Sequence, residues 1–440
     1  MAGLPTWVRP ALAGLTTRGR SFLAAGVAAA VCSLVLGQSD LMRVAVLLVA
    51  LPLACSVALI RANYRLSLTR SINPPRVVAG GMARVRLEMH NLTRLGTRVM
   101  LAEDRVPYAL GAPPRFVLDR LPGGRKAAVT YSLRSEIRGR YPIGPLRLRL
   151  TDAFGMCEVT RAFSATDSLV VLPKTWPLDA VRPGSMWGGK GESLSRRAAA
   201  SGEDDVATRE YRHGDDLRRV HWRSTARRGE LMVRTDEQPR RMRATVLFDA
   251  RRIGHRGDGP ASSFEWAVSA AASVAVHLAE QRYGVRIIHD GRTTSWSTPL
   301  TGIVSGSLLD DLAVVTTGPQ ELLADAVNVL ARDGGDGLVV VVLGETDESD
   351  VKALARLGQQ GGARGIAILL RTTNWGSLPE RRAEEIDEQR RTVARLLADT
   401  GWMVTEAGPE ETIATTWARV GGFSDSGAWA GRAMQGVAGS

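Results

Sequence analysis

Two apolar runs near the N-terminus constrain the fold of this chain more than any other feature. Residues 21–37 and 44–60 are nearly continuous apolar stretches, and Gln38, Ser39 and Asp40 separate them as a polar turn. Each run is at the short end of what crosses a bilayer as a helix, at about 1.5 Å per residue. Residues 41–43 can lengthen the second run. The sequence therefore predicts a two-helix membrane hairpin within an N-terminal segment 1–65, with spans at about 21–38 and 41–60.

The charges that flank the runs predict the orientation of the hairpin. Three arginines precede the first run and three follow the second: Arg9, Arg18, Arg20, Arg61, Arg65 and Arg70. The charged residues between the runs are Asp40 and Arg43. Because Lys- and Arg-rich flanks stay in the cytoplasm, both termini and the long soluble remainder are predicted to be cytoplasmic. We expect a two-pass protein of the cell membrane.

A cleaved signal peptide is the alternative for the first run, because Arg18 and Arg20 precede it as they would precede a signal. A second apolar run so soon afterwards favours a retained hairpin. The cysteines Cys32, Cys55 and Cys157 have no spacing typical of a metal site or a disulfide framework, which fits a reducing compartment.

The net charge is positive and comes almost entirely from arginine. The chain has 57 Lys and Arg against 45 Asp and Glu, a formal charge of +12. Such a balance favours attraction to anionic surfaces, either lipid headgroups or nucleic acid. No recognition helix, zinc finger or aromatic-rich RNA motif is present in the sequence, so we expect no nucleic-acid partner. A solvated, Arg-rich surface explains most of the excess.

Residues 66–175 have the pattern of a β-sandwich-like domain. Short alternating runs are broken by turn signals rich in Pro and Gly, as at residues 73–75 and 122–124. The predicted strands are 83–90, 98–103, 115–118, 126–133, 146–150 and 169–172. Residues 138–145 and 152–155 are interpreted as a structural corner in which Tyr141 and Phe154 pack.

The period of the sequence changes at residue 244. From there to residue 420 apolar strands alternate with amphipathic helices, which is typical of a doubly wound parallel α/β sheet. The predicted strands are 244–249, 285–289, 337–343, 365–370 and 402–405. The predicted helices are 264–281, 308–314, 321–332, 350–357 and 380–399. Residues 421–440, rich in Gly, Ala and Ser, are expected to be a flexible tail.

An Arg-rich block lies between these two predicted domains, in a segment 176–243 that we otherwise interpret as a linker. It runs from Arg209 to Arg227 as REYRHGDDLRRVHWRSTAR. Guanidinium groups make bidentate contacts with carboxylates or phosphates. Tyr211 and Trp222 are expected to be buried anchors with polar groups. The candidate partner-binding or structural residues are Arg209, Tyr211, Gly214, Asp215, Arg218, Trp222, Arg227 and Arg234.

This block, written R-E-Y-x-x-G-D-x-x-R-x-V-x-W-x-x-x-A-R and followed by Leu231, Val233, Arg234 and Glu237, resembles the core signature of bacterial DUF58 (domain of unknown function 58) proteins. The resemblance extends over most of the chain. It implies a membrane hairpin, a β domain, the signature and a von Willebrand factor type A-like domain. Members of that family are commonly encoded beside MoxR-type AAA+ ATPases and transglutaminase-like membrane proteins, so the resemblance implies both as partners. The biochemical role of the DUF58 family is not established.

Two interpretations of the signature stay open. In the first, Asp215 and Asp216 pair with nearby arginines and fix the segment where the β domain meets the type A-like domain. In the second, the arginines form a docking or phosphate-contacting surface. The arginines concerned are the same in both interpretations: Arg209, Arg218, Arg223 and Arg227. We favour the internal network, because interfacial Arg–carboxylate pairs commonly serve geometry, although a rigid loop also makes a good docking site.

Asp249 ends the first strand of the predicted α/β domain, where ligands of such sheets bind. In type A domains this position begins an Asp-x-Ser-x-Ser motif that holds magnesium. Here the run is Asp249-Ala250-Arg251-Arg252-Ile253, which lacks both serines and places two cations beside the carboxylate. We expect no metal, and we expect Asp249 to pair with an arginine or to cap the next segment. Glu345 and Asp347, after a later strand, are expected to be solvated.

Other catalytic or nucleotide-binding signals are weak. Residues 184–191 nearly match a P-loop, but Gly191 replaces the Ser or Thr, and the flanking strand and helix are missing from the pattern. His213 and His221 have no acid or nucleophile at a diagnostic spacing. The sequence contains no Gly-x-Ser-x-Gly elbow.

We therefore expect a membrane-anchored, non-enzymatic adaptor that uses no cofactor. Its cytoplasmic type A-like domain would bind a protein partner, and the resemblance implies a MoxR-type AAA+ ATPase in a chaperone-like or cell-envelope maturation role. The alternative is a nucleotide- or phosphate-binding enzyme that uses the Arg-rich signature and Asp249. A third hypothesis is that the arginines beside the hairpin bind anionic lipid and tune its position.

Overall fold

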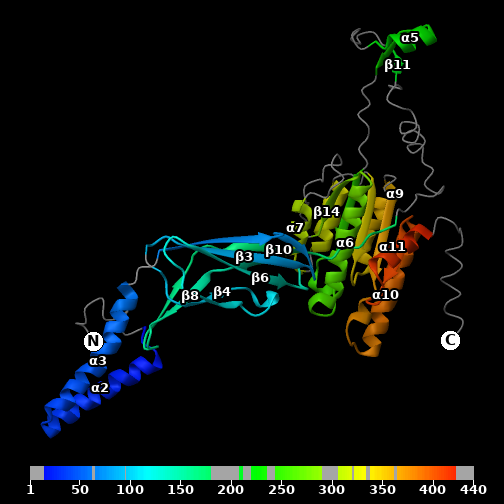
Figure 1. The fold of residues 1–440 in the computed structure, drawn as a ribbon. Coiled ribbons are helices and arrows are strands. Elements are labelled where there is room, and N and C mark those ends of the chain that lie inside the picture. The colour runs from blue at the N-terminus through cyan, green and yellow to red at the C-terminus, as the bar shows by residue number, and fades with distance from the viewer. Residues whose placement is uncertain are drawn as a thin grey trace. The chain divides into compact units, whose positions relative to one another are not determined.

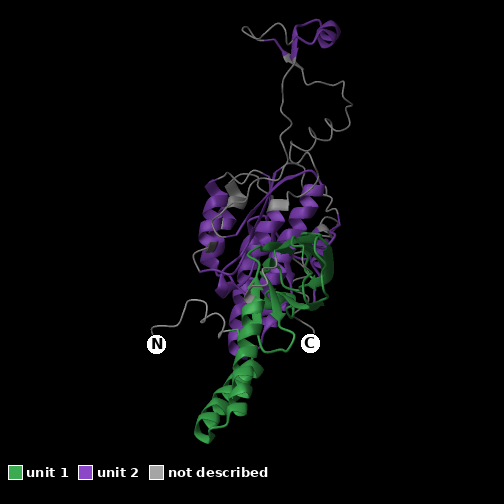
Figure 2. Ribbon diagram, turned by 60° about the vertical axis from the view of Figure 1, so that its left-hand side comes forward, with its two compact units in different colours: residues 1–172 green, residues 173–440 purple. Residues whose placement is uncertain are grey.

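The computed structural model describes residues 14–61, 65–94, 96–179, 208–211, 220–234, 243–289, 306–319, 322–332, 337–360 and 364–422. The chain divides into two compact units, residues 1–172 and 173–440 (Figure 2). The described residues form a mixed α and β structure with several sheets, and two apolar helices begin it. The P-loop-like run 184–191 lies outside the described residues.

The two predicted spans are helices, α2 (Thr17–Leu36) and α3 (Ser39–Arg61). The Thr16 side chain accepts a hydrogen bond from the Gly19 amide and caps the start of α2. Gly37 ends α2 with a φ of 64°, the left-handed conformation that glycine adopts at low cost. Both helices are long and apolar enough to cross a membrane, so they are compatible with membrane anchoring.

After the two helices, the described residues of unit 1 form ten strands in three sheets (Figure 1). The sheet orders are β1-β3-β6, β2-β10-β7 and β5-β4-β8-β9. The bounds are β1 (Leu66–Asn73), β2 (Arg76–Val78), β3 (Met82–Asn91), β4 (Met100–Asp104), β5 (Arg115–Leu118), β6 (Lys126–Arg134), β7 (Gly139–Ile143), β8 (Leu146–Thr151), β9 (Glu158–Ala162) and β10 (Asp167–Leu172).

Alternation with a period of two builds the core of this unit. In β3 the residues Ala83, Val85, Leu87 and Met89 are buried and their neighbours point outward. The same alternation in β8 directs its leucines inward, and all three sheets contribute to one apolar cluster. The six predicted strands are present, and the prediction missed β1, β2, β7 and β9.

One expectation for unit 1 was wrong. Phe154 is 58% exposed and does not pack into a corner, whereas the Tyr141 hydroxyl donates to the carbonyl oxygen of Ile137. Arg70, one of the arginines counted after the second apolar run, is buried in β1. Its Nη2 donates to Asp104 Oδ1 at 2.7 Å, and the Tyr131 hydroxyl donates to Asp104 Oδ2 at 2.5 Å. A buried guanidinium needs such partners because desolvation of the charge is costly.

Unit 2 contains a five-stranded parallel sheet in the order β14-β13-β15-β16-β17. The strands are β13 (Arg243–Phe248), β14 (Gly284–Ile288), β15 (Leu338–Leu343), β16 (Arg364–Leu370) and β17 (Met403–Ala407). β13 to β15 are buried along almost their whole length, as expected for strands covered on both faces.

Helices lie on both faces of this sheet (Figure 1). One apolar cluster contains residues of α6 (Ser263–Glu280), α7 (Gly306–Val314) and α11 (Ile413–Gly422). The other contains residues of α8 (Leu322–Arg332), α9 (Glu348–Gln360) and α10 (Glu380–Asp399). Each predicted strand and helix of this segment is present, while α11 was not predicted.

Candidate functional site at the sheet edge and the Arg-rich signature

The strand order gives the sheet a defined ligand-binding position. The strand that follows β13 in the sequence, β14, pairs with one edge of β13, and the next strand, β15, pairs with its other edge. The order of strands in the sheet therefore changes direction at β13. Open α/β sheets bind ligands at the carboxyl ends of strands at such a switch point. Asp249 follows β13 at this edge, and Gly344 and Glu345 follow β15.

Arg251 fills the centre of this edge. Its Nε and Nη2 donate to the two carboxylate oxygens of Asp249 at 3.0 and 2.9 Å, and its Nη1 donates to Asp350 Oδ2 at 2.7 Å. Nη2 also donates to the Glu345 carbonyl oxygen at 2.9 Å. The Arg251 side chain is 2% exposed and that of Asp249 is 0% exposed. The expected pairing of Asp249 with an arginine is therefore present, in a bidentate and buried form.

The two loops at the switch point are held at close approach. The Glu345 amide donates to the Gly254 carbonyl oxygen at 2.8 Å. A Cβ on Gly344 would lie 1.9 Å from that oxygen, so only glycine allows this contact. The short 3-10 turn Arg252–Gly254 brings the chain over the Asp249 carboxylate. The edge between β13 and β15 is thus closed by backbone and by the guanidinium.

A second layer surrounds this pair. His255 Nε2 lies 2.7 Å from the Asp249 carbonyl oxygen and its Nδ1 lies 3.1 Å from Ser263 Oγ. The carbonyl can only accept, so Nε2 carries the proton. Burial lowers the pKa of His255 and outweighs the opposing attraction of Asp249, so this imidazole is neutral at neutral pH.

Glu345 also belongs to this layer, and the expectation that it is solvated was wrong. Its carboxylate pairs with the Arg256 guanidinium and accepts from Thr372 Oγ1 at 3.1 Å, and its side chain is 16% exposed. Asp347, in contrast, accepts from the Asp350 amide at 2.9 Å in the first turn of α9. Its hydrogen bonds with Ser349 and Asp350 lower its pKa. Asp347 is a helix cap rather than a ligand.

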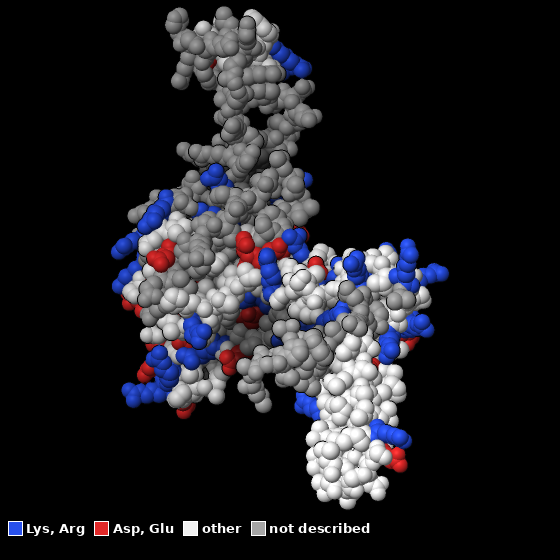
Figure 3. Space-filling model, turned by 90° about the vertical axis from the view of Figure 1, so that its left-hand side faces the viewer, with Lys and Arg blue, Asp and Glu red and all other residues white. Residues whose placement is uncertain are grey.

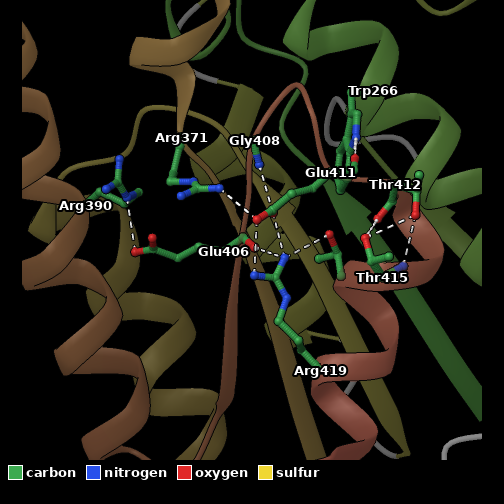
Figure 4. A network of polar contacts seen from close by, with 10 residues as sticks. Trp266, Arg371, Arg390, Glu406, Gly408, Glu411, Thr412, Thr415 and Arg419 are labelled. Carbon is green, nitrogen blue, oxygen red and sulfur yellow. Dashed lines mark hydrogen bonds and ion pairs between the residues drawn. The ribbon is translucent and has the colours of Figure 1, made fainter. Parts of the chain in front are cut away.

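A further ionic network occupies the same edge beside β16 and β17 (Figure 4). The Glu411 carboxylate accepts from Arg371 Nη2 at 2.8 Å and from Arg419 Nη2 at 2.6 Å. The Gly408 amide, immediately after β17, donates to Glu411 Oε2 at 3.2 Å. The charges of this part of the edge therefore hold α11 to the strands. Among the residues that the structure describes, no group of three or more His, Cys, Asp or Glu side chains could hold a metal ion.

The signature forms a small platform with a short helix. β11 (Thr208–Glu210) pairs antiparallel with β12 (Met232–Arg234), and α5 (Trp222–Arg228) lies between them in sequence. The His221 side chain accepts from the Ser224 amide and caps α5. Thr225 Oγ1 accepts from the Met232 amide at 3.0 Å, which ties the helix to β12. Met232 and Val233 are buried.

The signature residues have different surroundings. Trp222 is 69% exposed, so the expectation that it is a buried anchor was wrong. Arg227 is exposed on the same helix, and Tyr211 is partly buried. In the backbone register of β11 and β12, Arg209 lies opposite Val233 and Arg234 lies opposite Thr208. Three further candidates, Gly214, Asp215 and Arg218, lie outside the described residues together with His213 and Asp216.

Sequence reasoning missed how the sheet edge is assembled. Arg256, Asp350 and Thr372 were not candidates, and they come from segments far apart in the chain. One available signal was the run of two arginines directly after an aspartate at the end of a buried strand. A second was the pair Gly344-Glu345 after the apolar strand β15.

Comparisons with known proteins agree with the signature but do not supply an activity. The uncharacterized protein YeaD of Bacillus subtilis (strain 168) is 24% identical over 215 residues, which cover 47% of this chain and 51% of YeaD. The match thus spans about half the length of this relative.

The similar solved structures are remote. The CARDB domain of a Pyrococcus furiosus protein, crystallised in complex with di-metal ions, is 16% identical, with 24% of this chain and 93% of that chain covered and a TM-score of 0.20. The putative ApaA protein of Bordetella pertussis is 11% identical, with 25% and 94% covered and a TM-score of 0.20. Likenesses this slight assign neither a fold nor a ligand. Residues 207–383, from the signature to the start of α10, match the family described as protein of unknown function DUF58.

Proposed function

We propose that this protein is a membrane-anchored, non-enzymatic adaptor that docks a protein partner through the exposed face of α5. The observation that carries the proposal is the exposure of Trp222 beside the exposed Arg227 and Arg228. Trp and Arg are the residue types that most often dominate the energy of protein interfaces. A large aromatic side chain left in water is a cost that a bound partner removes.

The platform supports docking because it gives this face a fixed shape. A helix of seven residues is too short to be stable alone. α5 is instead fixed by the His221 cap, by the Thr225–Met232 hydrogen bond and by the buried Met232 and Val233. A pre-ordered surface loses little conformational entropy on binding.

The sheet edge supports a role without catalysis. The position where α/β sheets bind ligands is filled by Arg251, which is paired with Asp249 and Asp350. In the type A-like interpretation that the resemblance implies, Arg251 stands at the first serine of the Asp-x-Ser-x-Ser motif and Ile253 at the second. The guanidinium then supplies internally the positive charge that a metal supplies in that motif.

The finer organisation and the partner are part of the same proposal. The three sheets of unit 1 suit a β-sandwich-like domain, and the parallel sheet of unit 2 suits a von Willebrand type A-like domain. The arginines beside α2 and α3 favour a cytoplasmic location for both. The resemblance at the signature implies a MoxR-type AAA+ ATPase as the partner, and a transglutaminase-like membrane protein as a further member of the assembly.

Co-purification of the full-length chain from membranes tests the proposal. Wild type is compared with Trp222→Ala, Asp215→Ala and Arg218→Ala, and with Arg252→Ala as a control on an exposed arginine of the sheet edge. A MoxR-type AAA+ ATPase from the same organism is supplied without nucleotide, with ATP and with ADP. We expect the control to retain the ATPase and Trp222→Ala to lose it at an unchanged melting temperature. No association of the wild type in any nucleotide state would reject the proposal.

The alternative, a nucleotide- or phosphate-binding enzyme that uses the signature and Asp249, makes a different prediction. A nucleotide that binds the folded chain raises its melting temperature. At a ligand concentration of 100 times the Kd, the added free energy of unfolding is about 2.7 kcal/mol. ATP and GTP are tested with and without magnesium. The adaptor proposal expects no shift, and a shift that Arg218→Ala abolishes would favour the enzyme.

A further inference from the structure

The end of unit 1 from which the hairpin emerges combines three loops with the start of α2. The β8–β9 turn, residues 152–157, is hydrogen bonded directly to the hairpin: the Thr16 amide donates to the Met156 carbonyl oxygen at 2.9 Å, and Thr16 Oγ1 donates to that of Gly155 at 2.7 Å. The loop after β3 joins the other side of the hairpin, because the Leu92 amide donates to the Arg65 carbonyl oxygen at 2.8 Å. We call this end the hairpin-proximal surface.

The third loop, between β5 and β6, completes this surface. The Leu121 amide donates to Thr97 Oγ1 at 2.9 Å, and the Gly124 amide donates to the Asn91 carbonyl oxygen at 2.9 Å. Residues 92–94, 96–99, 119–126 and 152–157 therefore belong to one end of the sheets. The opposite end is marked by Tyr108, which follows β4 and is 98% exposed.

Helix lengths place the β8–β9 turn at the depth of the membrane boundary. Cys157 Sγ donates to the Pro52 carbonyl oxygen at 3.5 Å, so the turn lies beside the middle of α3 rather than at its end. From Ser39 to Pro52, α3 rises only about 20 Å at ~1.5 Å per residue. The hydrocarbon core of a bilayer is about 30 Å thick. Because about 20 Å is less than this thickness, a hairpin that crosses the core brings residues 152–157 at least as deep as the headgroup and acyl boundary.

The side chains of the hairpin-proximal surface suit that depth. Large apolar side chains point outward there, with Phe154 58%, Leu92 57% and Val99 55% exposed. Exposed basic residues surround them: Arg65, Arg94, Arg98, Arg120, Arg125 and Lys126. None of these six forms an ion pair with another residue in the described part of the chain, and Asp119 is the exposed acid among them. Figure 3 shows the mostly uncharged hairpin and blue side chains on unit 1 around it.

We propose that the hairpin-proximal surface is a membrane-binding surface: Phe154, Leu92 and Val99 insert at the boundary, and the surrounding basic residues bind anionic lipid headgroups. Apolar side chains ringed by Lys and Arg bind bilayers through burial of apolar area and attraction to anionic lipid. The inference rests on the membrane anchoring of the proposed function. It adds that the β part of unit 1 is held against the bilayer and is not a freely tethered domain.

Lipid photocrosslinking on the full-length chain in nanodiscs tests the insertion. A benzophenone amino acid replaces Phe154, Tyr108 or Leu47, one at a time. We expect lipid adducts at Leu47, within the hairpin, and at Phe154, and none at Tyr108. Adducts at Leu47 but not at Phe154 would overturn the inference and leave the anchoring intact. The absence of adducts at Leu47 would overturn the anchoring itself, and with it this inference.

The lipid charge is tested with the benzophenone at Leu92 in zwitterionic nanodiscs and in nanodiscs that contain phosphatidylglycerol. We expect several-fold more adduct with the anionic lipid and a loss of this gain in high salt. The gain should also be lost in a triple variant that combines Arg94→Gln, Arg98→Gln and Arg125→Gln. The gain should persist in the matched control, a triple variant at the opposite end of the sheets that combines Arg84→Gln, Arg105→Gln and Arg115→Gln. Equal adduct yields in zwitterionic and anionic nanodiscs would overturn the binding of anionic headgroups. This comparison needs no charge variant.

Discussion

The sheet edge and the signature of unit 2 are both rich in arginine but use it in opposite ways. Arg251 is 2% exposed, and its guanidinium donates to two carboxylates and a backbone carbonyl. On α5, Arg227 and Arg228 are exposed beside Trp222, which is 69% exposed. The first region is closed on itself, and the second is open to solvent.

The difference shows that burial decides what an arginine does. A guanidinium taken out of water must regain its lost hydration from nearby carboxylates and carbonyls, so the surrounding residues are fixed as a brace. An exposed guanidinium retains its hydration and has donors left for a partner. Composition cannot separate these two uses, because both regions read as Arg next to Asp in the sequence.

The largest expected effect is the removal of the brace. Arg251→Ala leaves the buried carboxylate of Asp249 uncompensated, and we expect a loss of about 3–5 kcal/mol in the free energy of unfolding. Arg252→Ala, the exposed neighbour, should cost under about 0.5 kcal/mol. Thermal melting of the full-length chain in detergent measures both. Equal, small effects would show that the sheet edge is no brace.

The next effect sharpens the other side of the comparison. Trp222→Ala should weaken partner binding by about 2 kcal/mol or more, roughly 30-fold in Kd, because exposed tryptophans at an interface centre are hot spots. Its melting temperature should stay within the error of the wild type. A large drop in melting temperature would mean that Trp222 supports the fold, and the contrast between the two regions would disappear.

A smaller effect is expected at Glu345. Glu345→Ala removes the partner of Arg256 and of Thr372, and we expect a loss of about 1–3 kcal/mol in the free energy of unfolding. Glu348→Ala is the matched control, since its pair with Lys352 is 56% exposed on both sides and exposed pairs contribute about 0–1 kcal/mol. If melting gives the same loss for both variants, the Glu345 pair is no part of the brace.

The smallest effect is a pH dependence of the brace. Burial lowers the pKa of His255 in the folded chain, so below about pH 6.5 the unfolded state binds a proton that the folded state does not. The contribution of His255 to stability is therefore present above the unfolded pKa and is lost as the pH falls below it. The hydrogen-exchange protection factors of residues 244–262, which correct for the slower intrinsic exchange at low pH, should fall more between pH 7 and 5 in wild type than in His255→Gln. Identical pH dependence in both would exclude His255 as the cause.

Local pattern was enough to predict the helices of the hairpin, most strands of unit 1 and every strand of the parallel sheet. Apolar length determines a span, and period-two alternation or continuous burial determines a strand, within a few neighbouring residues. The elements that were missed have weak local signals. β2 is three residues long, and β7 contains Gly139 and Pro142, which argue against a strand when read alone.

The sequence by itself determined the apolar hairpin, the order of strands and helices, and the presence of an Arg-rich signature. Only the tertiary structure decided that Arg70 and Arg251 are buried braces, that Glu345 is paired, and that Trp222 and Phe154 face outward. The physical reason is range. Secondary structure follows from side chains a few positions apart, whereas the burial and pairing of a charge depend on which distant segments meet. Arg251 and Asp350 lie 99 positions apart in the chain yet share a 2.7 Å hydrogen bond.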